Sequence, residues 1–185
     1  RVGDDQEQTI LRALETGPRS IMVPHVDSAE KAKKIAKSCK YFPEGSRGLS
    51  PYTRIHNFTH KDIESSLQSE NEVTMVGIIV EGKTGLANLE EIVKVKGIDL
   101  IYLGLFDICQ SVGLPGQLNH PKVLDEIKRC CELINSNGIA AGSMSTNLKY
   151  IQMLQEVGYS FIAYLNDAAA MKSHFDDVLQ KIHRS

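Results

Sequence analysis

The sequence has little cysteine and no long hydrophobic run, and each absence excludes a class of protein. The four cysteines, Cys39, Cys109, Cys130 and Cys131, show no C-x-x-C spacing and are too few for a disulfide scaffold. No apolar stretch approaches the roughly 20 residues that span a bilayer, and the N-terminus lacks the basic-then-apolar build of a signal peptide. We therefore expect a cytoplasmic protein with no membrane partner.

An excess of charge of one sign is also missing. The 21 Lys and Arg residues against 23 Asp and Glu residues give a net charge of −2, so no overall field draws the chain toward nucleic acid. The patterns G-x-x-x-x-G-K-[ST], G-x-G-x-x-G and G-x-S-x-G are absent, which removes the usual support for a nucleotide-binding protein or a serine hydrolase. We expect no nucleic-acid partner.

What is present is typical of an α/β domain. The 185 residues are 42% hydrophobic and 24% charged, which suits one domain spanning residues 1–185. Short apolar runs alternate with amphipathic stretches, as in βα units. The runs predict strands over residues 20–24, 73–80, 98–104, 139–141 and 160–165. Because these runs are continuously apolar, we expect both faces of the strands to be buried.

Helix patterns lie between these strands. The clearest covers residues 121–137, with one apolar stripe, Pro121 in its first turn and Gly138 as its stop. That stripe holds Val123, Leu124, Ile127, Cys131 and Ile134. Two more helices are predicted over residues 85–95 and 148–157. Capping-box spacing, Asp27 with Glu30 and Thr59 with Asp62, marks further helix starts.

The βα rhythm leaves two architectures open. At about 30 residues per unit the chain holds about six units, whereas a full (β/α)₈ barrel takes about 250 residues. Periodicity alone therefore favours a complete open sheet. Residues 41–60 form a long insert rich in Gly, Pro, Arg and His, and inserts of that length are usually functional. The Gly45-Ser46-Arg47-Gly48 cluster within it is also what an ordinary loop would contain.

Two acidic residues come shortly after the ends of predicted strands. Glu81 comes after the run V-G-I-I-V at 76–80, and Asp107 lies three residues beyond Gly104. Ligands of α/β folds bind at the carboxyl ends of the strands. Two carboxylates on neighbouring strand ends could hold one hard divalent cation, with waters or substrate oxygens as its other ligands. The alternative for each carboxylate is a helix cap.

Other reactive side chains give weaker signals. His25, His56, His60 and His120 are not at metal-ligand spacing, and among them His25 has a position at a strand end. Cys109 lies close to Asp107 but has no basic partner in the sequence, which argues against a nucleophilic role.

Five short motifs occur in a fixed order. They are I-M-V-P-H-V at 21–26, Y-F-P-E-G-S-R-G at 41–48, V-E at 80–81, G-L-F-D-I at 104–108 and H-P at 120–121. The series resembles the HpcH/HpaI family of metal-dependent pyruvate aldolases, whose patterns are V-P-x-V, P-x-G-x-R-G, Q-I-E-T, G-P-x-D-L-S and H-P-x-V. The resemblance covers essentially the whole chain.

The resemblance implies a (β/α)₈ TIM barrel and a class II aldolase. Family members split a 4-hydroxy-2-oxo acid, such as 4-hydroxy-2-oxoheptanedioate or 2-dehydro-3-deoxyglucarate, into pyruvate or a related 2-oxo acid and an aldehyde. Glu81 and Asp107 match the family's two metal-binding carboxylates, for Mg²⁺, Mn²⁺ or Co²⁺. Arg1 matches the arginine at the end of the third strand that binds the pyruvate oxygens. The two βα units before that strand, with the family's acid/base histidine, do not fall within residues 1–185.

The same resemblance implies how the substrate is held. The metal would act as a Lewis acid on the 2-oxo group and Arg1 would stabilise the enolate as the C3–C4 bond breaks. Backbone N–H groups around Leu105, Phe106 and Asp107 would bind the substrate carboxylate. It also implies a homo-oligomer, with a hexamer as one possible form.

Some positions depart from the family pattern. Ile79 stands where the family has Gln, and Gly82 stands where it has Thr, so polar groups near the metal are lost. Leu105 replaces the Pro of G-P, and Cys109 replaces a Ser. Substrate preference, metal preference or activity would then differ from those of characterised members.

Three hypotheses remain open at this point. The first is a divalent-metal aldolase or lyase of 2-oxo acids, favoured by Glu81, Asp107 and Arg47. The second is a non-catalytic barrel fragment or pseudo-enzyme that binds a ligand or serves in assembly, favoured by Ile79 and by the two absent units. The third is a lyase of acyl-CoA esters, which needs a basic CoA-binding surface. Because the histidine base is absent, we expect residues 1–185 alone to be a poor catalyst.

Overall fold

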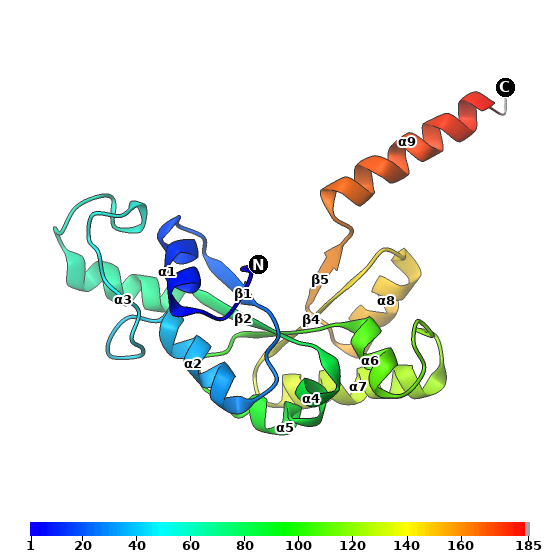
Figure 1. The fold of residues 1–185 in the computed structure, drawn as a ribbon, viewed down its shortest axis with the longest axis horizontal. Helices are drawn as coiled ribbons and strands as arrows, with labels where there is room; N and C mark the ends of the chain where they lie inside the picture. Colours follow the sequence, from blue (N-terminus) through cyan, green and yellow to red (C-terminus); the bar gives the residue numbers. More distant parts are fainter. Residues whose placement is uncertain (184–185) are drawn as a thin grey trace.

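The structure, a computed structural model, describes residues 1–183 and contains a five-stranded parallel sheet (Figure 1). The strands are β1 (Ser20–Val23), β2 (Met75–Val80), β3 (Leu100–Leu103), β4 (Ala140–Ser145) and β5 (Phe161–Tyr164). The helices are α1 (Glu7–Glu15), α2 (Ala29–Cys39), η1 (Arg54–His56), α3 (Ile63–Val73), α4 (Gly82–Ala87), α5 (Leu89–Ile92), α6 (Leu105–Ser111), α7 (Pro121–Ser136), α8 (Leu148–Val157) and α9 (Asp167–His183). The α/β class and the five strand regions predicted from the apolar runs are confirmed.

The strand order distinguishes between the two architectures. Each strand pairs in parallel with the next one along the chain, in the order β1-β2-β3-β4-β5. A doubly wound open sheet reverses its order at a switch point, whereas the sheet of a βα barrel does not. The expectation of a complete open sheet is therefore wrong: the sheet is curled like half of a barrel. The estimate of six units is also too high, since the described residues form five strands.

The two faces of the sheet differ in their cover. Val76, Ile78 and Val80 of β2 are fully buried in a core that they share with the helices. On the opposite face, Met75, Met144 and Phe161 remain 40–44% exposed. Figure 1 shows α2, α4, α5 and α7 along one side of the sheet. The expectation that both faces of the strands are buried is therefore wrong at these positions of β2, β4 and β5, because helices cover one face of the sheet and the other face borders a pocket.

The observed helix ends agree in part with those predicted from the sequence. Helix α7 begins at Pro121 as predicted, and its apolar stripe is buried at Val123, Ile127, Cys131 and Ile134. The predicted cap at Asp27 is wrong by one residue: Ser28 is the N-cap of α2, and its hydroxyl accepts from the Lys31 N–H at 3.3 Å.

Two further helix predictions need correction. Thr59 does not begin a helix, since its hydroxyl accepts from the Lys61 N–H in a turn and α3 starts at Ile63. The single helix expected over residues 85–95 is split into α4 and α5 at Asn88. The Asn88 side chain donates to the carbonyl oxygen of Asp27 at 2.7 Å, a bond outside its own helix that holds the break.

The insert at residues 41–60 is pinned to α3 by buried polar contacts. The Tyr41 hydroxyl lies 3.1 Å from His56 Nε2, and His56 Nδ1 lies 2.8 Å from the Ser66 hydroxyl. The Arg47 guanidinium stacks over the Tyr41 ring, 4.4 Å from its centroid. Burial lowers the pKa of His56, and the Arg47 charge lowers it further. His56 is therefore a structural side chain of this insert.

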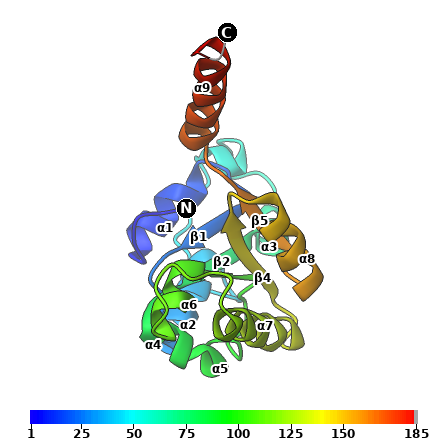
Figure 2. The same cartoon turned by 90° about the vertical axis from the view of Figure 1, so that its right-hand side faces the viewer.

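Helix α9 extends away from the rest of the chain, as the two views in Figures 1 and 2 show. No residue of α9, as described to His183, is buried. Within the described residues, no helix combines the length and apolarity that crossing a membrane requires.

Gly45 provides a stability test of the insert. A Cβ on Gly45 would lie 2.3 Å from both the Lys37 and the Lys40 carbonyl oxygens, which accept from the N–H groups of Ser46 and Arg47. We expect Gly45→Ala to lower the free energy of unfolding by about 1 to 3 kcal/mol, the usual cost of overpacking. Urea unfolding measures this, with Gly3→Ala as the control because nothing lies within 4 Å of that Cβ. Equal stability of the two variants would contradict the packing.

Candidate functional site

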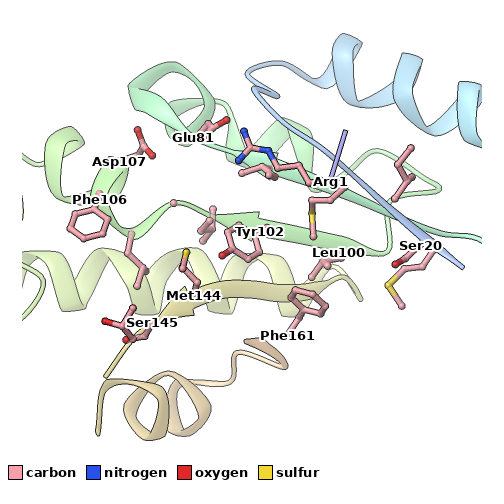
Figure 3. Close-up of a pocket in the computed structure, with 18 of the residues that line it drawn as sticks. Arg1, Ser20, Glu81, Leu100, Tyr102, Phe106, Asp107, Met144, Ser145 and Phe161 are labelled. Carbon is pink, nitrogen blue, oxygen red and sulfur yellow. The ribbon is translucent and has the colours of Figure 1, made fainter. Parts of the chain in front are cut away.

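A pocket of about 590 Å³ lies against the face of the sheet that the helices leave uncovered (Figure 3). Strands β1 to β5 all contribute side chains to it, and α6 closes one end with Leu105, Phe106 and Asp107. Its walls are mostly apolar. The charged side chains of the pocket are Arg1, Glu81 and Asp107. Figure 3 shows Glu81 and Asp107 at one end and Ser20 and Phe161 at the other.

The two acidic residues come from the ends of adjacent strands. Glu81 directly follows β2, and Asp107 lies in the first turn of α6, just after β3. Val80 of β2 pairs with Leu103 of β3, which brings the two carboxyl ends to one edge of the sheet. Glu81 is the N-cap residue of α4, but its side chain makes no capping hydrogen bond within the described chain, and the N-cap residue of α6 is Gly104, not Asp107. The helix-cap alternative therefore holds for Glu81 by position only and does not apply to Asp107.

Asp107 fits tightly beside the turn that precedes it. A Cβ on Gly104 would lie 2.5 Å from Asp107 Oδ2. The absence of a side chain at Gly104 thus leaves room for the carboxylate. Phe106, next to it, is 66% exposed, while Leu105 is buried.

Arg1 lies beside the free edge of β1. The Val2 N–H donates to the Met22 carbonyl oxygen at 3.0 Å, so the first residues run alongside this strand. Figure 3 shows the Arg1 side chain extending through the pocket toward Glu81. Burial raises the pKa of Tyr102, and the Arg1 charge opposes that rise, which places the cation within electrostatic reach of the pocket wall.

His25 contacts Glu81, a pairing that the sequence reasoning missed. His25 Nδ1 lies 2.7 Å from Glu81 Oε1, and the His25 backbone N–H donates to the same oxygen at 3.1 Å. A signal existed: His25 follows β1 as Glu81 follows β2, and these strands are neighbours. The sequence reasoning assigned each residue to the rim of the sheet without pairing them.

The donor set fits a hard divalent cation. Oxygen ligands from carboxylates are what Mg²⁺ and Mn²⁺ prefer, and Mg²⁺ is often held by one or two carboxylates with waters or substrate oxygens. No group of three or more His, Cys, Asp and Glu side chains within residues 1–183 could hold a metal ion. Glu81 and Asp107 are the carboxylates that this pocket could offer to such an ion.

The departures from the family pattern lie at the same site. Ile79 is 6% exposed and lines the pocket together with Glu81, two residues along the same strand face. Gly82 has a φ of +78°, a backbone conformation in which Thr would be strained. The pocket wall next to Glu81 is therefore apolar, and neither position 79 nor position 82 provides a polar side chain that could support a metal ligand.

Several other candidates lie outside this pocket. Cys109 is a fully buried residue of α6, and burial raises the pKa of its thiol, so it is no ready nucleophile. Arg47 lines a separate small cavity between α1 and α2. His60 contacts the Tyr52 hydroxyl, and His120 caps α7 by accepting from the Lys122 N–H at 3.2 Å. The structure thus gives Arg47 no part in the pocket, contrary to its use in support of an aldolase.

Comparison with known proteins gives a consistent result. The profile of the HpcH/HpaI aldolase/citrate lyase family matches residues 1–171. A hydroxypyruvate/pyruvate aldolase of Roseobacter denitrificans is 33% identical over 171 residues, covering 92% of this chain and 66% of that protein. A 2-dehydro-3,6-dideoxy-6-sulfogluconate aldolase of Pseudomonas putida is 33% identical over 184 residues, covering 97% and 69%. The chain thus spans about two thirds of the length of these relatives.

Solved structures agree. A HpcH/HpaI aldolase/citrate lyase family protein from Burkholderia cenocepacia J2315 superposes with a TM-score of 0.89 at 25% identity, over 100% of this chain and 72% of that one. The citrate synthase SbnG superposes with a TM-score of 0.82 at 26% identity, over 96% and 68%. Similarity in sequence and in fold thus covers the whole pocket.

Proposed function

The chain belongs to the HpcH/HpaI aldolase/citrate lyase family, and from this premise we propose that its pocket serves divalent-metal-dependent aldol cleavage. The substrate is a 4-hydroxy-2-oxo acid, and the products are pyruvate, or a close relative, and an aldehyde. The observation that carries the proposal is the placement of Glu81 and Asp107 at the ends of two adjacent strands, on one pocket with Arg1. The relatives named above are aldolases, which are carbon–carbon lyases.

Each residue has a defined part in this proposal. When bound, the metal supplies Lewis-acid chemistry to the 2-oxo group. Glu81 and Asp107 hold it, and Arg1 stabilises the negative charge that develops on the substrate oxygen as the C3–C4 bond breaks. The N–H groups at the start of α6, at Leu105, Phe106 and Asp107, have no partner within their own helix and bind the substrate carboxylate.

The fold proposal follows from the sheet. We infer that residues 1–185 form one domain and part of a (β/α)₈ barrel, with β1 to β5 in the places of barrel strands four to eight. Sequential parallel order, helices on one face and a TM-score of 0.89 to a longer family member support this. The residues beside β1 take the place of the end of strand three, as the family position of Arg1 implies. A homo-oligomer remains part of the proposal.

A lyase of acyl-CoA esters receives no support from this arrangement. The chain does carry a basic groove, which Lys33, Lys37 and Lys96 line. It opens next to the segment that leads into β3, at the amino ends of the strands. Glu81 and Asp107 lie at the carboxyl ends, so a CoA phosphate in this groove would point away from the proposed chemistry.

Pyruvate release tests the proposed reaction. The chain is incubated with a panel of 4-hydroxy-2-oxo acids and Mg²⁺, Mn²⁺ or Co²⁺, and pyruvate is followed by coupled oxidation of NADH. We expect slow release that needs metal, stops with chelator and is lost in Glu81→Gln and Asp107→Asn. Release that neither chelator nor these substitutions change would contradict the proposal. Metal and pyruvate binding without turnover of any substrate would favour the ligand-binding pseudo-enzyme.

Substitution of Ile79 by glutamine should strengthen metal binding, whereas substitution of Glu81 or Asp107 should weaken it. Ile79 and Glu81 share a strand face, so a glutamine amide at position 79 could reach the Glu81 carboxylate. We expect Ile79→Gln to tighten metal binding about 10-fold, since outer-sphere partners are commonly worth about 10- to 100-fold. Calorimetric titration with Mn²⁺ measures this, with Ile79→Leu as the control for altered packing. Equal or weaker affinity in the glutamine variant would mean that the pocket is tuned to a less polar ligand.

A further inference from the structure

His25 makes two contacts with a single oxygen of Glu81. Its ring Nδ1 and its backbone N–H both lie within hydrogen-bond distance of Oε1, at 2.7 Å and 3.1 Å. A carboxylate only accepts hydrogen bonds, so Nδ1 carries the proton in this pair. Among the hydrogen bonds of the described residues, none occupies Oε2. His25 therefore holds Oε1 of Glu81 from the rim of the sheet, and Oε2 is left for a ligand in the pocket.

The loop that carries His25 is itself anchored. The Lys31 ammonium donates to the His25 carbonyl oxygen at 2.8 Å, and the Val26 N–H donates to the Ile79 carbonyl oxygen at 3.0 Å. His25 has a φ of +59°, in the left-handed region that few side chains other than Asn, Asp and His adopt readily. These bonds hold the residue in that conformation, so the ring has a fixed place from which to orient Glu81.

Folding stability does not account for the pair. The His25 side chain is 69% exposed, and exposed ion pairs and hydrogen bonds contribute about 0 to 1 kcal/mol. The neighbouring side chain on the β2 face, Ile79, offers no hydrogen bond to Glu81. The contact is instead of the kind that orients a carboxylate ligand of a metal ion.

We propose that His25 is the positioning residue of Glu81: it fixes Oε1 so that the carboxylate meets the divalent cation in a single orientation. The proposal rests on the proposed function, in which Glu81 and Asp107 hold that cation. His25 then supplies the polar support that the apolar Ile79 cannot.

Two variants separate the ring contact from the backbone conformation. Asn and Gly both tolerate a positive φ, but only His25→Asn keeps a side-chain N–H at the position of Nδ1, whereas His25→Gly has none. Each is titrated with Mn²⁺ by calorimetry in the whole chain, and urea unfolding verifies that both variants fold. We expect His25→Gly to weaken Mn²⁺ binding about 10-fold and His25→Asn to stay within about 3-fold of the unaltered chain.

The outcomes separate this proposal from the function on which it rests. Unchanged Mn²⁺ affinity in His25→Gly, or equal weakening in both His25 variants, overturns the positioning role, even where Glu81→Gln and Asp107→Asn abolish binding. No Mn²⁺ binding by the unaltered chain, or no effect of those two substitutions, overturns the metal site itself. A double variant, Ile79→Gln with His25→Gly, should recover affinity that His25→Gly loses. If the double variant binds Mn²⁺ no better than His25→Gly, the side chains at positions 25 and 79 do not support Glu81 in the same way, which would contradict the proposal.

Discussion

Glu81→Gln and Asp107→Asn should each remove nearly all divalent-metal binding by the chain. In the proposed site these two carboxylates are the protein ligands, so either substitution would take away half of the protein's coordination and one negative charge. The loss should exceed the roughly 10- to 100-fold that the loss of an outer-sphere partner costs. Calorimetric titration with Mg²⁺, Mn²⁺ and Co²⁺ measures it.

Matched controls separate this result from a general effect of charge. Asp125→Asn and Glu132→Gln make the same chemical changes at exposed positions of α7, remote from the pocket. Both should bind metal like the unaltered chain. Metal affinity that survives in Glu81→Gln and Asp107→Asn would show that the ion binds elsewhere.

Gly104→Ala should impair metal binding while leaving the fold almost unchanged. The added Cβ would meet Asp107 Oδ2 at 2.5 Å, and the flexible tip of that side chain can move aside at little cost. In the proposed site, however, that movement would displace a metal ligand. We expect Mn²⁺ affinity to fall about 10-fold or more, since positions of ligating groups matter at the scale of about 0.5 Å.

The stability of the same variant provides the internal control. Gly104 has a φ of −76°, which alanine adopts freely, so the free energy of unfolding should change by less than about 1 kcal/mol. Urea unfolding and metal titration of Gly104→Ala, beside Gly3→Ala, test both halves. Intact metal affinity with the same stability would mean that Asp107 is not held against this turn when the ion binds.

The sequence predicted the elements better than their arrangement. The apolar runs identified all five strand regions because each strand has a core-facing side that must be apolar, as in Val76, Ile78 and Val80 of β2. Strand order depends on how β1 to β5 curl together, which no local pattern records. For the same reason, runs that include Met75 and Phe161 gave a false prediction of burial on both faces.

In the candidate site, too, the positions of single residues could be predicted from the sequence, but the contacts between them could not. The positions of Glu81 and Asp107 could be predicted, because the residues that come just after a buried strand lie at the carboxyl end of the sheet. The His25–Glu81 pair joins residues 56 positions apart, and only the pairing of β1 with β2 brings them together. The Asp27 cap was misplaced by one residue because Asp27 and Ser28 are both good N-cap residues and the backbone, not the composition, chooses between them.

Pyruvate binding with and without metal tests the central claim most directly, because it needs neither turnover nor knowledge of the aldehyde. The chain is titrated with pyruvate in the presence of Mn²⁺, in the presence of chelator, and as the Asp107→Asn variant with Mn²⁺. We expect pyruvate to bind when Mn²⁺ and both carboxylates are present, and at least about 10-fold more weakly in the other two cases. Equal pyruvate affinity in all three titrations would contradict the account.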